Sequence, residues 1–248
     1  MFAATHLIGF GASAGYATGA SNFDGTNDWG LRGADLTGNA DGKKGLVSFW
    51  VRFQGGNAAL QRIYDASGTV HNIQRSADDT FRFFFGSGVR ISASSTGTYV
   101  VASGWVHVLA AWDLATPVFR LFINNADDEA GGSTESGAAD IDYTLAQHTI
   151  GASDGGGASI LNADLADFYF NMAETLDIST AANRARFISG GKPVDLGADG
   201  ALPTGTAPII FLRRVPGASA DSFLTNKGTG GGFTVTGALT ASTTTPSD

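Results

Sequence analysis

The stretch Trp105–Asn125, WVHVLAAWDLATPVFRLFINN, decides the fold. It contains apolar runs at Trp105–Trp112 and Val118–Ile123, and the short link between them includes Pro117. Two such runs, rich in Val, Phe, Ile and Trp, predict a β-hairpin. The first run alternates between two mostly apolar faces, with Val106, Val108, Ala110 and Trp112 on one and Trp105, His107, Leu109 and Ala111 on the other. A strand of this kind is expected in the middle of a buried sheet and not at a solvated edge.

Composition places the rest of the chain in the all-β class. The 248 residues include 35 Gly, and the scarcity of Glu and Lys leaves few strong helix formers. Aromatic residues make up 10% of the chain, which argues against disorder. With a net charge of −8 there is no cluster of Lys and Arg for phosphates, so nucleic-acid binding is not expected. The chain has no Cys and therefore no disulfide and no thiolate metal site.

The first residues, MFAATHLIGFGASAG, are mildly apolar but lack the positively charged start of a signal peptide and are interrupted by His6. We therefore expect a strand at Thr5–Phe10, no signal peptide, and synthesis in the cytoplasm. No apolar run approaches the length that spans a bilayer, so membrane insertion is not expected.

Further strands are expected where short apolar or alternating runs lie between turn residues. Leu46–Phe53 is the clearest, because Val47, Phe49, Val51 and Phe53 share one face. The other expected strands are two within Ser21–Arg32 on either side of Asp24–Asp28, and those at Arg62–Ala66, Val70–Arg75, Thr80–Phe85, Val89–Ala93, Ile141–Leu145, Thr149–Ala152, Ala163–Phe170, Ile209–Leu212, Phe223–Thr225 and Phe233–Val235.

One helix is expected at Thr180–Ile188, with Ser179 as N-cap and Gly190–Gly191 as its end. Ala126–Ala139 is expected to be a long loop. We find no internal repeat and no linker, which predicts a single domain over residues 1–248, with an N-terminal strand in 1–20 and a C-terminal extension, 190–248, packed on it. About a dozen short strands with one short helix near 180–188 predict a jelly-roll sandwich of two antiparallel sheets.

Four segments together resemble the laminin G-like, concanavalin A-like lectin/glucanase superfamily. They are SNFDGTNDW at Ser21–Trp29, SFWVRF at Ser48–Phe53, the hairpin at Gly104–Asn125, and ADLADFYFN at Ala163–Asn171. The resemblance implies a concanavalin A-like sandwich and, by itself, no function. The remaining part, Leu176–Asp248, resembles the end of stand-alone members of this superfamily that tailed bacteriophages encode.

The glucanase branch implied by this resemblance uses paired carboxylates that alternate along one strand. This chain has only Glu129, Glu135 and Glu174, and none of them lies in an E-x-D-x-E pattern. Asp140 and Asp142 do alternate, but no Glu accompanies them. Glycosidase activity is therefore not expected.

Other catalytic patterns are equally weak. G-x-S-x-G occurs around Ser13 and Ser153, but no helical pattern follows, as a nucleophile elbow requires. The four His residues fall on different expected strands without zinc-ligand spacing, and His107 is expected to hold a local hydrogen-bond network. We expect no catalytic residue, no cofactor-binding residue and no enzyme activity.

Calcium is the one inorganic ligand that the sequence leaves open. The candidate ligands are Asp24, Asn27 and Asp28, with Asp164 or Asp167 from across the fold. The favoured interpretation is structural: an Asx-turn at Asp24 and capping by Asp167. No metal-ligating residue is therefore assigned.

Exposed aromatic side chains could stack on sugars. Trp29, Tyr99 and Tyr143 lie near expected turns, and the sequence does not rank them against ordinary packing at the rim.

The functional prediction is a non-enzymatic structural or adhesive protein on the virion surface of a tailed bacteriophage, as a decoration protein or a fibre. Its expected partners are other virion proteins and further copies of itself in a homo-oligomer, with host surface glycans as an additional ligand. The alternative is a free, lectin-like carbohydrate-binding module, with or without calcium.

Overall fold

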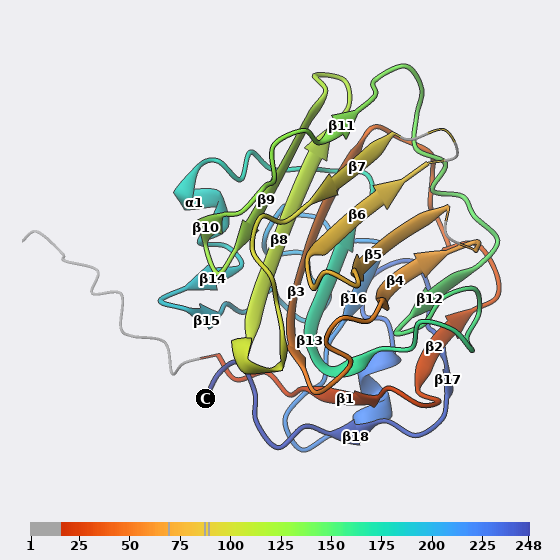
Figure 1. Ribbon diagram of the computed structural model, residues 1–248, viewed down its shortest axis with the longest axis vertical. Coiled ribbons are helices and arrows are strands. Elements are labelled where there is room, and N and C mark those ends of the chain that lie inside the picture. The colour runs from red at the N-terminus through yellow and green to blue at the C-terminus, as the bar shows by residue number, and fades with distance from the viewer. Residues whose placement is uncertain (1–15, 69, 87, 89) are drawn as a thin grey trace, which may run out of the picture.

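The computed structural model describes residues 16–68, 70–86, 88 and 90–248. Within them, two eight-stranded antiparallel sheets face each other (Figure 1). The first sheet has the order β10-β9-β8-β3-β13-β1-β18, and β16 also pairs with β13. The second sheet has the order β11-β7-β6-β5-β4-β12-β2-β17. The predicted all-β jelly-roll sandwich is thereby confirmed. The strand expected at Thr5–Phe10 lies outside the described residues.

The first sheet is built from strands far apart in the sequence. They are β1 (Ser21–Asp24), β3 (Lys44–Phe53), β8 (Val106–Asp113), β9 (Val118–Ile123), β10 (Ala126–Asp127), β13 (Asn162–Asn171), β16 (Ile210–Leu212) and β18 (Thr240–Ala241). The second sheet takes mainly a run of consecutive strands. They are β2 (Trp29–Arg32), β4 (Gln61–Ala66), β5 (His71–Arg75), β6 (Phe81–Phe85), β7 (Ile91–Ser94), β11 (Thr134–Glu135), β12 (His148–Ile150) and β17 (Thr234–Thr236).

The predicted hairpin is present as β8 and β9, with Trp112 opposite Phe119. β8 also pairs with β3, which places the hairpin next to the centre of the first sheet. Trp112 points between the sheets and is 1% exposed. Its indole nitrogen donates a 2.9 Å hydrogen bond to the Tyr143 hydroxyl. The expectation of a buried strand is confirmed.

The inner face of β3 is the expected one, with Val47, Phe49, Val51 and Phe53 in the main core. Phe residues of the second sheet meet it across the sandwich. Phe81, for example, lies 6.2 Å from the Phe49 ring in an edge-to-face arrangement, which is favourable for aromatic pairs.

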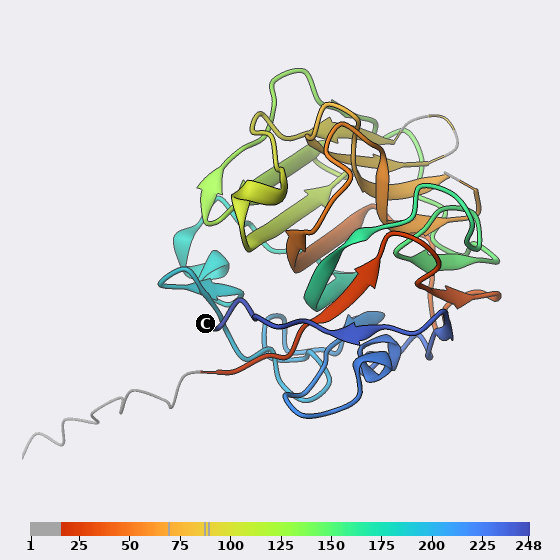
Figure 2. The same cartoon turned by 60° about the horizontal axis from the view of Figure 1, so that its bottom comes forward.

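The outer face of the first sheet is also covered. Leu46 of β3, Leu109 of β8 and Tyr169 of β13 form a second apolar cluster with side chains from the C-terminal part of the chain. Those side chains include Ile178, Phe187, Leu196 and Phe211. Residues from about 176 to 209, together with the C-terminal tail near Thr244, thus form a third layer on the sandwich, which Figure 2 shows below the first sheet. Other parts of the C-terminal region join the two sheets as β16, β17 and β18.

The turn at Asp24–Asp28 carries the chain between the two layers. β1 lies in the first sheet and β2 in the second, so these two strands do not form a hairpin. The Asp-Gly pair still makes the predicted tight turn, with Gly25 at a φ of 76°.

The expected helix Thr180–Ile188 is wrong in length. The structure has only α1 (Ala181–Arg184), with Thr180 and not Ser179 at the N-cap. Phe187 and Ile188 are buried, and Ile188–Ser189 forms β14, which pairs with β15 (Lys192–Pro193). Gly190 and Gly191 have positive φ and make the turn of this hairpin. Packing against the first sheet outweighs the local helical tendency here.

Three other expectations need correction. Phe223–Thr225 is not a strand, because η2 (Ala220–Leu224) turns Phe223 and Leu224 into the main core. In Ile141–Leu145 only Ile141 forms a bridge, to Gly42. The loop at 126–139 contains two short edge strands, β10 and β11.

Gly45 provides a test of the contact between β3 and β8. It lies opposite Trp112, and a Cβ atom there would overlap the indole ring. We expect Gly45→Ala to lower the free energy of unfolding by about 1–3 kcal/mol, because Trp112 must shift within a close-packed core. Urea denaturation followed by Trp fluorescence measures this.

The matched control is Gly33→Ala, because Gly33 is exposed and a Cβ there meets nothing within 4 Å. We expect a change within about 0.5 kcal/mol. Equal effects of the two substitutions would contradict the packing argument.

Candidate functional site

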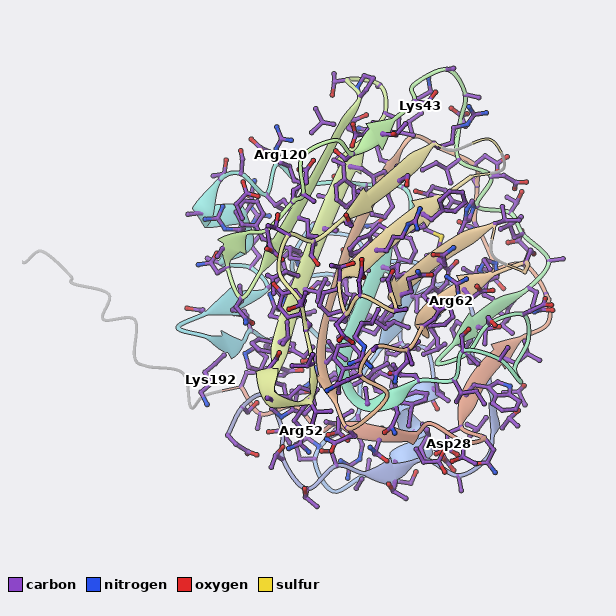
Figure 3. The ribbon with its side chains drawn as sticks, viewed as in Figure 1. Asp28, Lys43, Arg52, Arg62, Arg120 and Lys192 are labelled. Carbon is purple, nitrogen blue, oxygen red and sulfur yellow. The ribbon has the colours of Figure 1, made fainter. Side chains whose placement is uncertain are left out.

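The residues considered for calcium do not converge. The Asp24 carboxylate accepts hydrogen bonds from the backbone of Thr26 and Asn27, which is the Asx-turn that the sequence favoured. Asp28 is buried and accepts the amide of Ala238 at 2.9 Å. Figure 3 shows Asp28 at the edge of the molecule where β1 and β2 meet. Among the described residues, no group of three or more His, Asp or Glu side chains could hold a metal ion.

Asp164 is held by donors from three residues on the outer face of the first sheet. Its carboxylate accepts bonds from Arg52, Gln54 and Asn22, and the Arg52 Nη2 lies 2.7 Å away. This carboxylate is a fixed anchor for Arg52.

Asp167 lies at a β-bulge in β13, with φ of 47°. It accepts hydrogen bonds from Thr18 Oγ1 at 2.8 Å and from the Tyr16 hydroxyl. Burial raises the pKa of this carboxyl to about 6, against the opposing effects of Thr18, Arg213 and Tyr16. Its role is to tie the segment before β1 to the sheet, which is the structural function expected for it.

The described histidines are internal. His107 is 0% exposed, its Nε2 lies 2.9 Å from Ser48 Oγ, and burial lowers its pKa to about 3. His71 and His148 contact the backbone carbonyls of Asp142 and Leu145. The hydrogen-bonding role expected for His107 is confirmed.

Two of the three Glu side chains considered for catalysis bond to neighbouring residues, and the third, Glu135, has a buried Oε1 without a hydrogen-bond partner among the described residues. Glu129 lies 3.6 Å from Arg120 and accepts a bond from Ser133. Glu174 accepts the Thr206 hydroxyl at 2.7 Å. Ser153 donates its hydroxyl to a backbone carbonyl within its own loop, at Ala158. Ser13 lies outside the described residues.

The aromatic residues named as sugar platforms are poorly placed. Tyr143 is 0% exposed, so it does not provide the exposed stacking surface that was considered for it. Tyr99 packs on Phe81 and donates its hydroxyl to Asp128 at 2.6 Å. Trp29 is half-buried, and the loop at Gly156 lies directly against its ring.

A cleft of about 480 Å³ opens instead on the outer face of the first sheet, and we call it the Trp105 cleft. Its lining residues come from the sandwich and from the third layer. They are Trp50, Arg52, Gly104, Trp105, Asn124, Gly191, Lys192, Thr244, Thr245, Pro246 and Asp248. The C-terminal end lies beside the β14–β15 hairpin in Figures 1 and 2. Pro246 and Asp248 at this end line the cleft.

Strand alternation builds the sandwich wall of the cleft. Trp50 and Arg52 are on the face of β3 opposite its core residues, and Trp105 precedes β8 on the same outer face. Trp105 is half-buried, and its indole nitrogen donates a 3.1 Å hydrogen bond to Thr244 Oγ1. The Arg52 guanidinium lies 5.6 Å from the Trp105 ring centroid, within the range of a cation–π contact.

Polar groups surround this indole. Asn124 is exposed and lines the cleft, and its Oδ1 accepts the His107 amide at 2.8 Å. Lys192 is exposed and donates to the backbone carbonyls of Ser247 and Asp248. Figure 3 shows Lys192 and Arg52 on the same side of the molecule, opposite Lys43. The arrangement sets a half-buried indole among hydrogen-bond donors and acceptors.

Part of this site was within reach of the sequence. Alternation in Leu46–Phe53 places Trp50 and Arg52 away from the core, and alternation in Trp105–Trp112 separates the two tryptophans. The other wall, which contains Lys192 and Thr244, could not be predicted from the sequence. Its position depends on how the residues after 187 fold back against the first sheet.

Comparisons with known proteins agree with the architecture. A family model described as "Concanavalin A-like lectin/glucanases superfamily" matches residues 15–173. Among curated proteins, none matches the chain. No helix in the part of the chain that the structure describes is long and apolar enough to cross a membrane.

Two solved structures share the fold at low sequence identity. One is a proposed carbohydrate-binding protein from Bacteroides ovatus, at 12% identity and a TM-score of 0.63, covering 91% of this chain and 59% of that protein. The other is a SAP-like pentraxin from Limulus polyphemus, at 15% identity and a TM-score of 0.51, covering 79% of this chain and 92% of that one. This chain therefore spans less than two thirds of the Bacteroides protein.

Asp167 makes the stability of the fold depend on pH. Its pKa of about 6 in the folded chain exceeds the 3.8 of a free carboxyl, so the folded state is favoured below pH 4 and loses that advantage as pH rises through 6. We expect Asp167→Asn to be more stable than the parent at pH 7.5 by about 2 kcal/mol, and the difference to shrink between pH 6 and pH 4. Denaturant titrations across this range measure it.

Asn accepts the left-handed backbone at this position, so the substitution adds little strain. The control is Asp140→Asn at an exposed site, where no buried carboxyl is removed. A pH-independent difference between Asp167→Asn and the parent would contradict the assignment.

Proposed function

Because the chain belongs to the concanavalin A-like lectin/glucanase superfamily, we propose that it is a non-enzymatic carbohydrate-binding protein whose ligand occupies the Trp105 cleft. The observation that carries this proposal is the half-buried Trp105 ring, set among Arg52, Lys192 and Asn124 in a cleft of about 480 Å³. The lectin-like fold, shared with the Bacteroides protein, supports it.

The chemistry of the cleft suits a sugar ring. A pyranose presents C–H groups on its faces and hydroxyls around its edge, so it needs an apolar flat surface with hydrogen-bonding groups beside it. Trp supplies a large rigid surface at low entropic cost, and it is enriched at binding hot spots. Arg52, Lys192 and Asn124 supply donors, and Asp248 supplies an acceptor.

The distribution of carboxylates supports binding without hydrolysis. A glycosidase needs two carboxyl groups roughly 5–9.5 Å apart on opposite sides of the scissile bond. The acidic residue that lines the Trp105 cleft is Asp248, and nearby Asp164 is already bonded to Arg52, Gln54 and Asn22. Asp248 and Asp164 therefore do not form the pair of free carboxyl groups that hydrolysis needs.

We further propose that this binding serves adhesion at the virion surface of a tailed bacteriophage, where the chain would contact other virion proteins and further copies of itself. The resemblance of residues 176–248 to phage-encoded members of the superfamily supports this location. The third layer is made from parts of this segment, so the segment with that resemblance also supplies one wall of the cleft.

Trp105→Ala tests the binding site. We expect glycan binding, screened on an array and then measured by calorimetry, to weaken at least about tenfold, because the stacking surface is lost. Lys192→Ala should weaken it less, because an exposed ammonium is one donor among several.

Trp29→Ala is the matched control, since Trp29 is also half-buried but lies on the second sheet. It should bind as the parent does, and so should the parent in EDTA, because the carboxylates considered for calcium already accept protein hydrogen bonds. Loss of binding in Trp29→Ala with retention in Trp105→Ala would assign the ligand to the other sheet. Loss in EDTA would instead favour the calcium-dependent module.

Purified particles test the location. We expect an antiserum against the chain to label intact phage particles from a lysate in which it is made, and the chain to remain with them through a density gradient. Recovery only in the soluble fraction would favour a free lectin-like module.

A further inference from the structure

A second cavity, of about 770 Å³, adjoins the Trp105 cleft. It lies between the segment before β1, the β14–β15 hairpin, the loop after Arg213 and the C-terminal end. Lys192, Thr245 and Asp248 line both spaces, so the two are neighbours on the same face of the molecule. We call it the Tyr16 cavity, after the aromatic residue in its wall.

We propose that the Trp105 cleft and the Tyr16 cavity form one groove that binds a linear oligosaccharide of several sugar units. This inference rests on the proposed function, and it names the class of ligand. Each space alone lies in the range of about 300–1,000 Å³ that is typical of sites for drug-sized ligands. A single sugar ring would leave most of such a groove unfilled.

The Tyr16 cavity has the elements of a second sugar subsite. The Tyr16 hydroxyl donates a hydrogen bond to Asp167, and the Arg213 guanidinium lies over the Tyr16 ring, 4.8 Å from its centroid. Arg213 in turn pairs with Asp195 at 3.2 Å, and Asp195 lines the cavity. The aromatic residue and its cation repeat the pairing of Trp105 with Arg52.

Arg214 adds a fixed donor to this wall. It is 9% exposed, and it donates through Nε to Ala218 and through Nη1 to Ala20. Neither bond uses Nη2. A guanidinium that is already ordered loses little entropy when it binds a hydroxyl, which favours binding.

Lys192 lies where the two spaces meet. Its ammonium group contacts the backbone oxygens of Ser247, which lines the Tyr16 cavity, and of Asp248, which lines both spaces. A chain that runs from Trp105 to Tyr16 therefore passes this ammonium group. Covalent linkage of the sugar units makes binding in the second subsite intramolecular, so affinity should rise steeply with chain length.

The test uses oligosaccharides of one to six units from chitin, starch, cellulose, xylan and polygalacturonate, measured by calorimetry on the full chain. For the series that binds, we expect affinity to rise at least tenfold from one unit to four. Ser189→Trp, at an exposed position in the wall of the Tyr16 cavity, should abolish this rise and leave the affinity for one unit unchanged.

Thr116→Trp is the control, because Thr116 is exposed in the turn between β8 and β9 and lines neither space. It should keep the full length dependence. Tyr16→Leu, checked for an unchanged melting temperature, should flatten the rise as Ser189→Trp does.

The outcomes separate the two proposals. Equal affinity of the parent for one and four units overturns the extended groove and leaves the Trp105 cleft as a site for one sugar. A length dependence that survives Ser189→Trp and Tyr16→Leu also overturns it. Absence of binding to every series contradicts the proposed function itself, and this inference with it.

Discussion

The structure depends on a sheet that is apolar on both faces. β3, β8 and β13 place large side chains on each side, so one face packs against the second sheet and the other must also be covered. The third layer meets that requirement. The same alternation separates the tryptophans of one strand region: an odd spacing sends Trp112 into the core and Trp105 to the opposite face. One hairpin therefore supplies both the centre of the fold and a wall of the candidate site.

The sequence predicted what is local and periodic. The hairpin, the inner face of β3 and the Asx-turn at Asp24 all follow from neighbouring residues, and the structure has each of them. Predictions failed where distant packing decides, as at Phe223, which lies in a 3₁₀ turn, and at Ile188, which is in a strand. The cleft could not be predicted for the same reason. The bond between Trp105 and Thr244 joins residues 139 positions apart, and no local pattern announces such a contact.

The polar groups of the cleft are held in place from behind. Arg52 is fixed by the buried Asp164, Asn124 by the His107 amide, and Trp105 by Thr244. Side chains ordered before a ligand arrives do not have to be immobilised when it binds, and this reduces the cost of association. Two of the carboxylates that were considered as calcium ligands thus have a different role. Asp164 positions Arg52, and Asp167 positions Tyr16.

The boundary of the family match divides the candidate site in two. Trp50, Arg52, Trp105 and Asn124 fall within the matched residues 15–173, whereas Lys192 and the tail that carries Thr244 lie beyond them. Membership of the superfamily accordingly accounts for the sandwich that carries the aromatic wall, but not for the groups on the opposite wall. Function resides in sites added to a fold and not in the fold alone. The third layer covers the apolar outer face of the first sheet, so it is part of the folded structure and not an optional addition. The segment that completes the packing also sets the shape of the groove, and ligand preference should change with it even where the sandwich stays the same.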